Sequence, residues 1–291
     1  MVLFEGGCPV ILVVGATGNV GRHVVERLRT TTQASVRALV VPARRRTFGL
    51  PADVEVAEGS LTEPESVESA LTGVDTVLLI WPFLTTDGAP EVLRAIGRRA
   101  PRLVYLSSTG VGGRPEEQDD PIFALHAEME RLIAQSGLPH TVLRSDTIAS
   151  NTLGWADQIR TTGVVRGPLT AATAVIDPRD IAAVAARVLT DDKHTGATYT
   201  LTGPQVISRP EQVEAIGRAI GRPLAFEEVP VPEARRQMLA DGRPPALVDA
   251  LLAAAEKRSA STLVTSTVED LTGVPARSFQ QWADDHADAF R

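Results

Sequence analysis

The sequence predicts an α/β protein in which a doubly wound parallel sheet is followed by a smaller C-terminal α+β lobe. Three observations lead to this expectation. A buried strand runs directly into three closely spaced glycines near the start of the chain, short apolar runs then alternate with amphipathic segments, and the last third of the chain departs from that alternation. The first two features are typical of parallel sheets that helices cover on both faces.

The glycine-rich stretch carries the strongest local signal. An apolar run at residues 10–14 leads into a G-x-x-G-x-x-G pattern and then into a helix expected at 19–30. The first glycine allows a sharp turn, the second lets backbone approach a pyrophosphate, and the third lets the helix pack close to the sheet. The phosphate would lie on free N–H groups at the positive end of the helix. The stretch predicts a Rossmann-type dinucleotide site, against the alternative of a Gly-rich turn without a ligand. The residues expected to contact the cofactor are Gly15, Thr17, Gly18, Asn19, Val20 and Gly21.

Short apolar runs after the first helix predict further buried strands. Strands are expected at residues 35–41, 54–57, 76–80, 103–106 and 141–144, with helices between them at 64–71, 90–99 and 122–136. This alternation implies a parallel sheet with helices on both faces.

The rest of the chain mixes the two kinds of element. A helix at 177–190 starts with a proline in its first turn and is followed by a strand at 199–201 that would rejoin the sheet. Helices at 210–221 and 233–260, the second broken at 242–245, flank an extended segment at 223–232. We therefore expect residues 1–150 to form the dinucleotide-binding domain, with 176–203 returning to it, and residues 151–175 and 204–291 to form the smaller substrate lobe.

Composition limits the function classes. The chain has 291 residues and a formal net charge of −7, which argues against a nucleic-acid or membrane-surface partner. No apolar run is long enough to cross a membrane and no signal peptide is recognisable. The single cysteine, Cys8, cannot form an internal disulfide, so we expect a reducing, cytoplasmic location. No metal-ligand spacing occurs. The expected partner is a small-molecule substrate, and homo-oligomerisation stays open.

The end of the second strand bears on the choice of dinucleotide. NAD-preferring sites place an acid there, whereas NADP-preferring sites place an arginine. Residues 36–46 contain no acid but contain Arg37, Arg44, Arg45 and Arg46. Because a guanidinium matches a 2′-phosphate bidentately, the sequence favours NADP over NAD, with Arg37, Arg44 and Arg45 as cofactor ligands. In the alternative interpretation the arginines form a solvated loop and only one of them contacts the cofactor.

Two further strand ends carry candidate cofactor contacts. Ser60 and Leu61 follow the third strand, where an adenine-contacting turn is typical, and Trp81 and Pro82 follow the fourth strand. Ligands in open α/β sheets bind outside the carboxyl ends of the strands, so all four residues are expected to line the cofactor site. Trp81 is equally well explained as a packing aromatic.

Several segments together resemble the NmrA-like atypical short-chain dehydrogenase/reductases. They are GATGNVGR, VYLSSTGV and SGLPHTVLRSDTIASN, with support from IDPRDIAAVAARVL and YTLTGPQVISRPEQVEAIGRAIGRP. The resemblance covers nearly the whole chain. Similar members include NADPH-dependent quinone reductases, triphenylmethane-dye reductases, and redox-sensing regulators that bind dinucleotide without turning it over. The resemblance also implies that Phe279 and Trp282 pack a terminal helix.

The catalytic pattern of short-chain reductases is only partly present. It requires a Tyr, a Lys four residues later and a Ser after the fifth strand. The serine position corresponds to Ser107 and Ser108, with Ser108 the better match for the catalytic serine and Ser107 a further expected cofactor contact. Ile122 occupies the Tyr position and His126 the Lys position. Some quinone reductases resemble this arrangement, which implies that His126 contacts the cofactor ribose and can carry a proton. A histidine that merely packs is the alternative.

Other polar residues are less specific. Asn151 and Trp155 stand where the substrate lobe begins and are candidate substrate contacts, although an asparagine there could also stabilise a turn. Glu128 and Glu130, on the helix that carries His126, are expected to face solvent.

These residues predict an NADPH-dependent oxidoreductase that transfers hydride to a quinone-like or other conjugated carbonyl substrate, with Ser108 and His126 as catalytic residues. Such an acceptor needs less proton assistance than a simple ketone, because delocalisation stabilises the product of hydride addition. The missing tyrosine leaves two alternatives. One is a non-catalytic NAD(P)-binding redox sensor, and the other is a cofactor-assisted isomerase or cyclase.

Overall fold

The computed structural model describes residues 8–42, 50–112, 118–258 and 261–291. The strands within these ranges are β1 (Val10–Val14), β2 (Ser35–Val40), β3 (Glu55–Glu58), β4 (Thr76–Leu79), β5 (Arg102–Ser108), β6 (His140–Ser145), β7 (Val164–Gly167), β8 (Thr198–Leu201) and β9 (Ala225–Glu228).

Helices alternate with these strands through most of the chain. The α-helices are α1 (Gly21–Thr31), α2 (Pro64–Ala70), α3 (Ala89–Arg99), α4 (Pro121–Gln135), α5 (Ala156–Thr162), α6 (Pro178–Leu189), α7 (Arg209–Ile220), α8 (Val231–Ala240), α9 (Pro245–Lys257), α10 (Thr267–Thr272) and α11 (Phe279–Asp285). Short 3-10 helices are η3 (Ala149–Trp155), η4 (Asp192–His194) and η5 (Ala287–Ala289).

The chain forms two compact units. The first unit comprises Met1–Thr109, His126–Arg144 and Pro178–Thr200, and the second comprises Gly110–Leu125, Ser145–Asp177 and Leu201–Arg291. The second unit thus includes residues that the expected division assigned to the dinucleotide-binding domain, namely 110–125, 145–150, 176–177 and 201–203.

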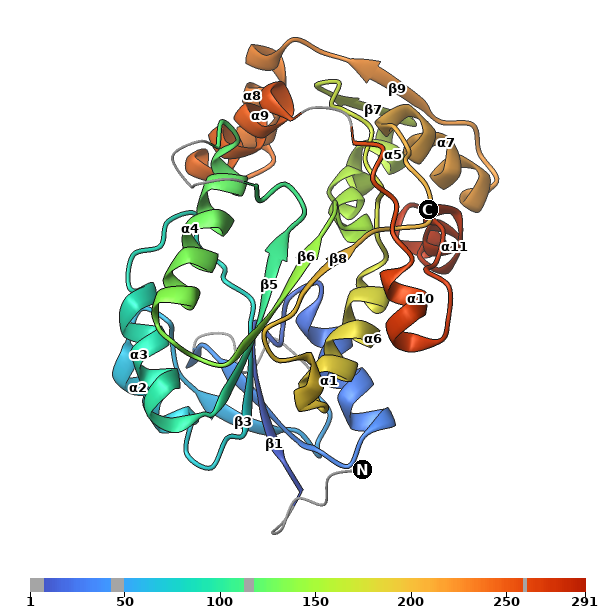
Figure 1. Ribbon diagram of the computed structural model, residues 1–291. Coiled ribbons are helices and arrows are strands. Elements are labelled where there is room, and N and C mark those ends of the chain that lie inside the picture. Colours follow the sequence, from blue (N-terminus) through green and yellow to red (C-terminus); the bar gives the residue numbers. More distant parts are fainter. Residues whose placement is uncertain (1–7, 43–49, 113–117, 259–260) are drawn as a thin grey trace. The chain divides into compact units, whose positions relative to one another are not determined.

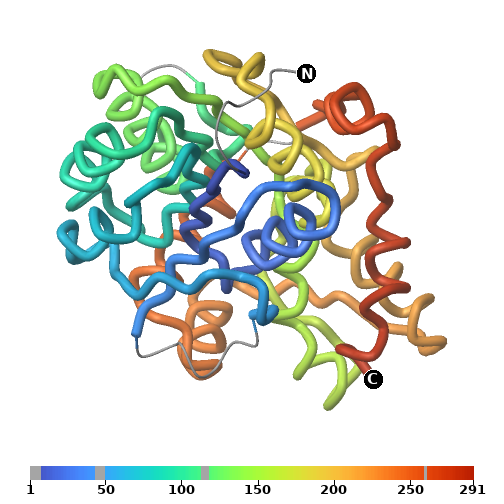
Figure 2. The backbone as a smooth tube through the Cα atoms, turned by 90° about the horizontal axis from the view of Figure 1, so that it is seen from below, coloured from blue at the N-terminus to red at the C-terminus, as the bar shows by residue number. Residues whose placement is uncertain are grey.

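A seven-stranded sheet organises the first unit, in the order β3-β2-β1-β4-β5-β6-β8. The β1–β2, β1–β4, β2–β3 and β4–β5 pairs are parallel. The helices α1 and α6 lie side by side on one face, and α2 and α3 lie together on the other (Figures 1 and 2). The direction of the strand order reverses between β1 and β4, which is the point where doubly wound sheets bind ligands. The predicted fold class is confirmed.

Burial explains why the expected strands form. Every residue of β4 is buried, and so are residues 11–14 of β1, as in parallel strands that helices cover on both faces. The predicted strands and helices of the first 150 residues are confirmed within two residues at each end. The strand expected at 199–201 does rejoin the sheet, as β8 beside β6. The short elements β7, α5 and α10 were not predicted.

Two arginines fasten helix ends to the sheet of the first unit. Arg102, at the start of β5, donates hydrogen bonds to the carbonyl oxygens of Val188, Leu189 and Asp191 at the end of α6. Arg37, on β2, does the same at the end of α2. Cations at helix C-termini satisfy carbonyl groups that have no partner within the helix and interact favourably with the helix dipole.

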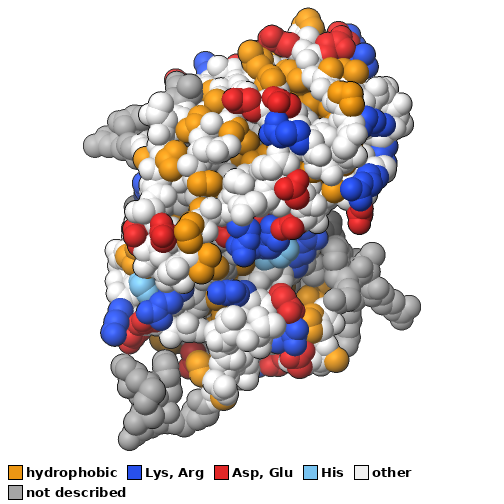
Figure 3. Space-filling view, turned by 90° about the vertical axis from the view of Figure 1, so that its right-hand side faces the viewer, with side chains coloured by type: hydrophobic (Ala, Val, Ile, Leu, Met, Phe, Trp, Pro, Cys, Tyr) orange, Lys and Arg blue, Asp and Glu red, His pale blue; other side chains and the backbone are white. Residues whose placement is uncertain are grey.

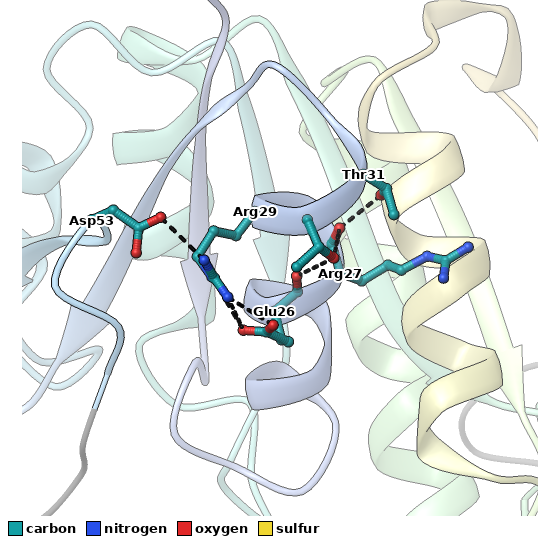
Figure 4. A network of polar contacts seen from close by, with 6 residues as sticks. Glu26, Arg27, Arg29, Thr31 and Asp53 are labelled. Carbon is teal, nitrogen blue, oxygen red and sulfur yellow. Dashed lines mark hydrogen bonds and ion pairs between the residues drawn. The ribbon is translucent and has the colours of Figure 1, made fainter.

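The outer face of α1 is polar and solvated. Arg29 forms an ion pair with Glu26 at 2.8 Å and a second with Asp53 at 3.5 Å (Figure 4). Acidic and basic side chains mix over the side of the molecule that carries α1 and α6 (Figure 3). Exposed pairs of this kind contribute little to stability, so the apolar inner face holds α1 in place.

The second unit has its own core. Phe279 and Trp282 stack at 5.4 Å between ring centroids and pack with Phe290, Ile159 and Ile216. The first turn of α11 is closed by a capping box in which Ser278 and Gln281 bond reciprocally. The expected packing of the terminal helix by Phe279 and Trp282 is confirmed. A parallel pair of strands, β7 and β9, adds a small sheet.

Candidate cofactor and active site

The glycine turn after β1 has the geometry that its sequence predicts. Gly15 adopts φ +87°, a left-handed conformation that side-chain-bearing residues rarely adopt. A side chain at Gly21 would collide with the Gly15 carbonyl group, because the start of α1 packs directly against the turn. The first and third glycines therefore serve the sharp turn and the close helix packing.

This turn leaves backbone donors available. The N–H of Gly18 donates to the Gly15 carbonyl at 3.0 Å, and the N–H of Arg22 to the Gly18 carbonyl at 3.2 Å. The N–H groups of Asn19 and Val20 have no hydrogen-bond acceptor among the described residues. No acidic side chain occupies the first turn of α1 to compete for them. The chain thus has free donors at a positive helix end, which is what a pyrophosphate requires.

The loops after β3 and β4 contain the other expected cofactor contacts. The Ser60 hydroxyl lies 2.7 Å from that of Thr62, and Leu61 is buried. The indole N–H of Trp81 donates to the Thr85 carbonyl at 2.8 Å, and the residue is only 7% exposed. For Trp81 these contacts favour the packing interpretation, while the neighbouring Pro82 is exposed.

Arg37 is held by groups of α2 and β3 and not by the loops at the cofactor edge. Its guanidinium donates to the carbonyl oxygens of Ala70 and Thr72, both at 2.7 Å, and lies 2.9 Å from the Glu55 carboxylate. These groups lie at the C-terminal end of α2 and the amino end of β3, whereas ligands bind outside the carboxyl ends of strands. The prediction that Arg37 contacts the cofactor is therefore wrong, because α2 already occupies its donors. Arg44 and Arg45 lie outside the described residues.

Replacing Arg37 should separate stability from cofactor choice. We expect Arg37→Gln to lower the free energy of unfolding by about 1–2 kcal/mol, because carbonyls at the end of α2 lose charged donors. The ratio of NADPH to NADH affinity should stay unchanged. Arg44→Gln should instead lower that ratio about tenfold and leave stability unchanged. Urea denaturation measures the free energy of unfolding, and cofactor titration measures the ratio of NADPH to NADH affinity. A changed ratio in Arg37→Gln would show that Arg37 does contact the cofactor.

The end of β5 meets α4 through a histidine–tyrosine pair. The Tyr105 hydroxyl lies 2.7 Å from Nδ1 of His126. Burial, followed by the charge of Glu130, raises the pKa of Tyr105, so its phenol stays protonated. A protonated phenol can donate to Nδ1 or accept from it, so the tautomer of a neutral His126 sets the direction of this hydrogen bond. Sequence reasoning missed Tyr105, although it lies two residues before Ser107 in the segment VYLSSTGV.

A second polar group lies one helical turn along α4. The Glu130 carboxylate accepts hydrogen bonds from the Ser107 hydroxyl at 2.6 Å and from Arg144 at 3.0 and 2.6 Å. Its side chain is only 14% exposed, so the expectation that Glu130 faces solvent is wrong. The four-residue spacing from His126 puts both side chains on one helix face and was the available signal. Glu128, by contrast, pairs with Arg131 on the outer side of α4.

The remaining candidates divide between the two units. Ser108 is the partly exposed last residue of β5, in the first unit. Ile122 belongs to the second unit, in the first turn of α4, which the Asp120 carboxylate caps. Asn151 is exposed in η3 of the second unit, and Trp155 packs partly against that unit's core. Their roles stay predictions.

The described residues offer neither a metal site nor a membrane-spanning helix. No group of His, Cys, Asp or Glu side chains there is arranged to hold a metal ion. None of the described helices has the length and apolar character needed to span a membrane.

Comparisons with known proteins agree with this geometry. Residues 15–192 match the family described as NAD(P)H-binding. A (4-alkanoyl-5-oxo-2,5-dihydrofuran-3-yl)methyl phosphate reductase of Streptomyces griseus is 40% identical over 96% of this chain and 99% of its own. An NAD(P)H azoreductase of Xenophilus azovorans is 34% identical over 96% of this chain and 99% of its own. The structure of an NADPH-dependent quinone oxidoreductase of Escherichia coli is 25% identical, with a TM-score of 0.79 over 97% of this chain and 100% of its own.

The family match begins at the first glycine of the turn and extends through β5, α4 and α6. It covers more than half of the chain, and the similar proteins align over nearly their full lengths. The expected resemblance to NmrA-like reductases is confirmed. The chain therefore belongs to the NAD(P)H-binding family.

Proposed function

We propose that this chain is an NADPH-dependent reductase of a small, conjugated carbonyl compound. The observation that carries the proposal is His126, which the buried Tyr105 holds at 2.7 Å where short-chain reductases use a lysine. The usual tyrosine acid is replaced by Ile122. A site with one titratable imidazole and no phenol at that position suits a substrate that needs little proton assistance.

Each residue of the proposed site has a stated part. Bound NADPH would supply a hydride. The N–H groups of Asn19 and Val20 hold the pyrophosphate, and Arg44 and Arg45 bind the 2′-phosphate. Ser108 donates a hydrogen bond to a substrate carbonyl. His126 contacts the ribose or returns a proton through Nε2.

Ser107 and Glu130 act behind these groups. Because Glu130 accepts hydrogen bonds from both Ser107 and Arg144, it ties the end of β5 to α4 and β6. This fixes the strand end that presents Ser108 and keeps His126 in register with Tyr105. We regard Ser107, Glu130 and Tyr105 as positioning residues.

The similar enzymes indicate the kind of acceptor. The substrate named for the Streptomyces griseus relative has a carbon–carbon double bond in its ring, and one of the two carbons of this bond carries two carbonyl groups. Hydride addition to the other carbon leaves an enolate shared by both carbonyls, and one proton completes the reduction. The azo and quinone groups named for other relatives also spread the added electron pair. We therefore propose an electron-poor, doubly activated double bond or quinone as the acceptor.

The direct test is NADPH consumption, followed by absorbance, with an acceptor panel. We expect turnover with quinones or an acylated butenolide and none with simple ketones. If the chain binds NADPH with micromolar affinity but does not oxidise it with any acceptor of the panel, it is a dinucleotide sensor. Substrate conversion without net NADPH consumption would indicate an isomerase or cyclase.

A further inference from the structure

The charges of Arg243 and Arg258 act on Arg209, and all three arginines belong to the second unit. Arg209 is the first residue of α7, while Arg243 precedes α9 and Arg258 directly follows it. The Arg209 guanidinium donates to the Pro168 carbonyl at 2.6 Å, at the end of β7. Arg243 lies against Gly154 of η3: a Cβ atom at residue 154 would be 2.8 Å from Nη2 of Arg243. We call these three residues the arginine cluster.

Little negative charge offsets this cluster. Asp120, whose side chain is only 3% exposed, pairs with Arg258 at 3.1 Å, and its other oxygen caps α4. Arg258 also lies over the Phe123 ring, at 4.4 Å from the centroid. Neither Arg209 nor Arg243 forms an ion pair with a carboxylate among the described residues. Two of the three positive charges therefore lack an acidic partner within the described ranges.

An anion beside these guanidinium groups would offset the repulsion between their charges. Burial, then the charges of Arg243 and Arg258, lower the pKa of Arg209 to about 10. Arg209 also stands at the positive end of α7, which disfavours a cation. A phosphate would offset the charge repulsion and the unfavourable position at the helix end, because guanidinium groups bind phosphate oxygens bidentately.

The position of the cluster connects it to the substrate. Arg243 contacts η3, and that segment contains both candidate substrate residues, Asn151 and Trp155. Because residue 154 is a glycine, the Arg243 guanidinium can approach the backbone of η3 closely. All of these residues belong to the second unit.

We propose that Arg209 and Arg243 bind the phosphate monoester group of a phosphorylated substrate beside η3, with Arg258 strengthening the positive field. The identity of the molecule that carries this phosphate rests on the proposed reductase function. The phosphate ester in the substrate named for the 40% identical relative has the chemistry that this cluster would recognise.

Kinetics with a matched pair of substrates test the proposal. The probes are an acylated butenolide methyl phosphate and its dephosphorylated alcohol. We expect Arg243→Gln to raise KM for the phosphate ester about 10- to 100-fold and to leave the alcohol unaffected. Arg218→Gln is the control, because Arg218 is on the same helix α7 but is exposed and paired with Glu214. Equal effects on both substrates, or equal effects of both variants, would overturn the site.

Binding without turnover separates this proposal from the reductase proposal. Calorimetry with phenyl phosphate should give binding to the full-length chain that Arg243→Gln removes and that the conservative Arg209→Lys weakens. This result would support the site even if no acceptor oxidised NADPH. Absence of phenyl phosphate binding to the unaltered chain would overturn it. A loss of NADPH affinity in Arg243→Gln would also overturn it, because the cluster would then bind the cofactor's phosphate.

Discussion

The Gly21→Ala variant is expected to lose at least about 100-fold in NADPH affinity and to unfold at a lower temperature than the unaltered chain. The added methyl group would overlap the Gly15 carbonyl and approach the Ala16 backbone to 2.9 Å. Backbone atoms cannot rotate away as a flexible side chain does, so either the turn or the start of α1 must shift. Both movements displace the N–H groups of Asn19 and Val20 that are proposed to hold the pyrophosphate. Fluorescence titration with NADPH and thermal denaturation measure the two effects.

Gly97→Ala provides the matched control in the same unit. Gly97 lies inside α3, and an added methyl group would be 3.4 Å from the nearest atom, Leu138 Cδ2. Because alanine favours helix over glycine, this variant should be as stable as the original or up to about 1 kcal/mol more stable. NADPH binding should not change. If Gly21→Ala bound NADPH as tightly as Gly97→Ala, the glycine turn would not be the pyrophosphate site.

The features that local sequence determines were predictable. The turn at Gly15, the continuous apolar strands and the helix starts each depend on a few adjacent residues, and each occurs where it was expected. The packing of the terminal helix by Phe279 and Trp282 was implied by the family resemblance, and the structure adds that their rings stack. The alternation of strands and helices predicts a parallel sheet, and dinucleotides bind at the carboxyl edge of such a sheet.

Pairings between distant segments were not predictable from the same patterns. Arg37 donates to carbonyl groups 33 and 35 residues away in the sequence. Its place in the same arginine-containing stretch as Arg44 and Arg45 therefore led to the wrong prediction that it binds the cofactor. From the sequence alone Glu130 is indistinguishable from a solvent-exposed helix residue. In the structure β5 and β6 place Ser107 and Arg144 within hydrogen-bond distance of its carboxylate. The arginine cluster joins residues from both ends of α9 and the start of α7, with no motif to mark it. Such sites depend on the assembled fold.

The His126→Ala variant is expected to lower kcat about 100-fold with the preferred acceptor. General acid–base groups contribute roughly 10²–10⁴-fold, and an acceptor that delocalises charge should lie at the lower end. Tyr105→Phe should lower kcat by up to about 10-fold, because it removes one hydrogen bond and leaves the imidazole in place. Single-turnover measurements at saturating NADPH separate these effects from cofactor binding.

The same unit contains a matched control pair. His194 Nδ1 lies 2.7 Å from the Tyr199 hydroxyl, the same distance as between His126 and Tyr105. His194 precedes β8 at the amino end of the sheet, away from the carboxyl ends where dinucleotides bind. His194→Ala should therefore disturb local packing equally but leave kcat unchanged. If both histidine variants lowered kcat alike, the effect would arise from general destabilisation. If neither did, hydride transfer would proceed without an imidazole, and solvent would supply the proton.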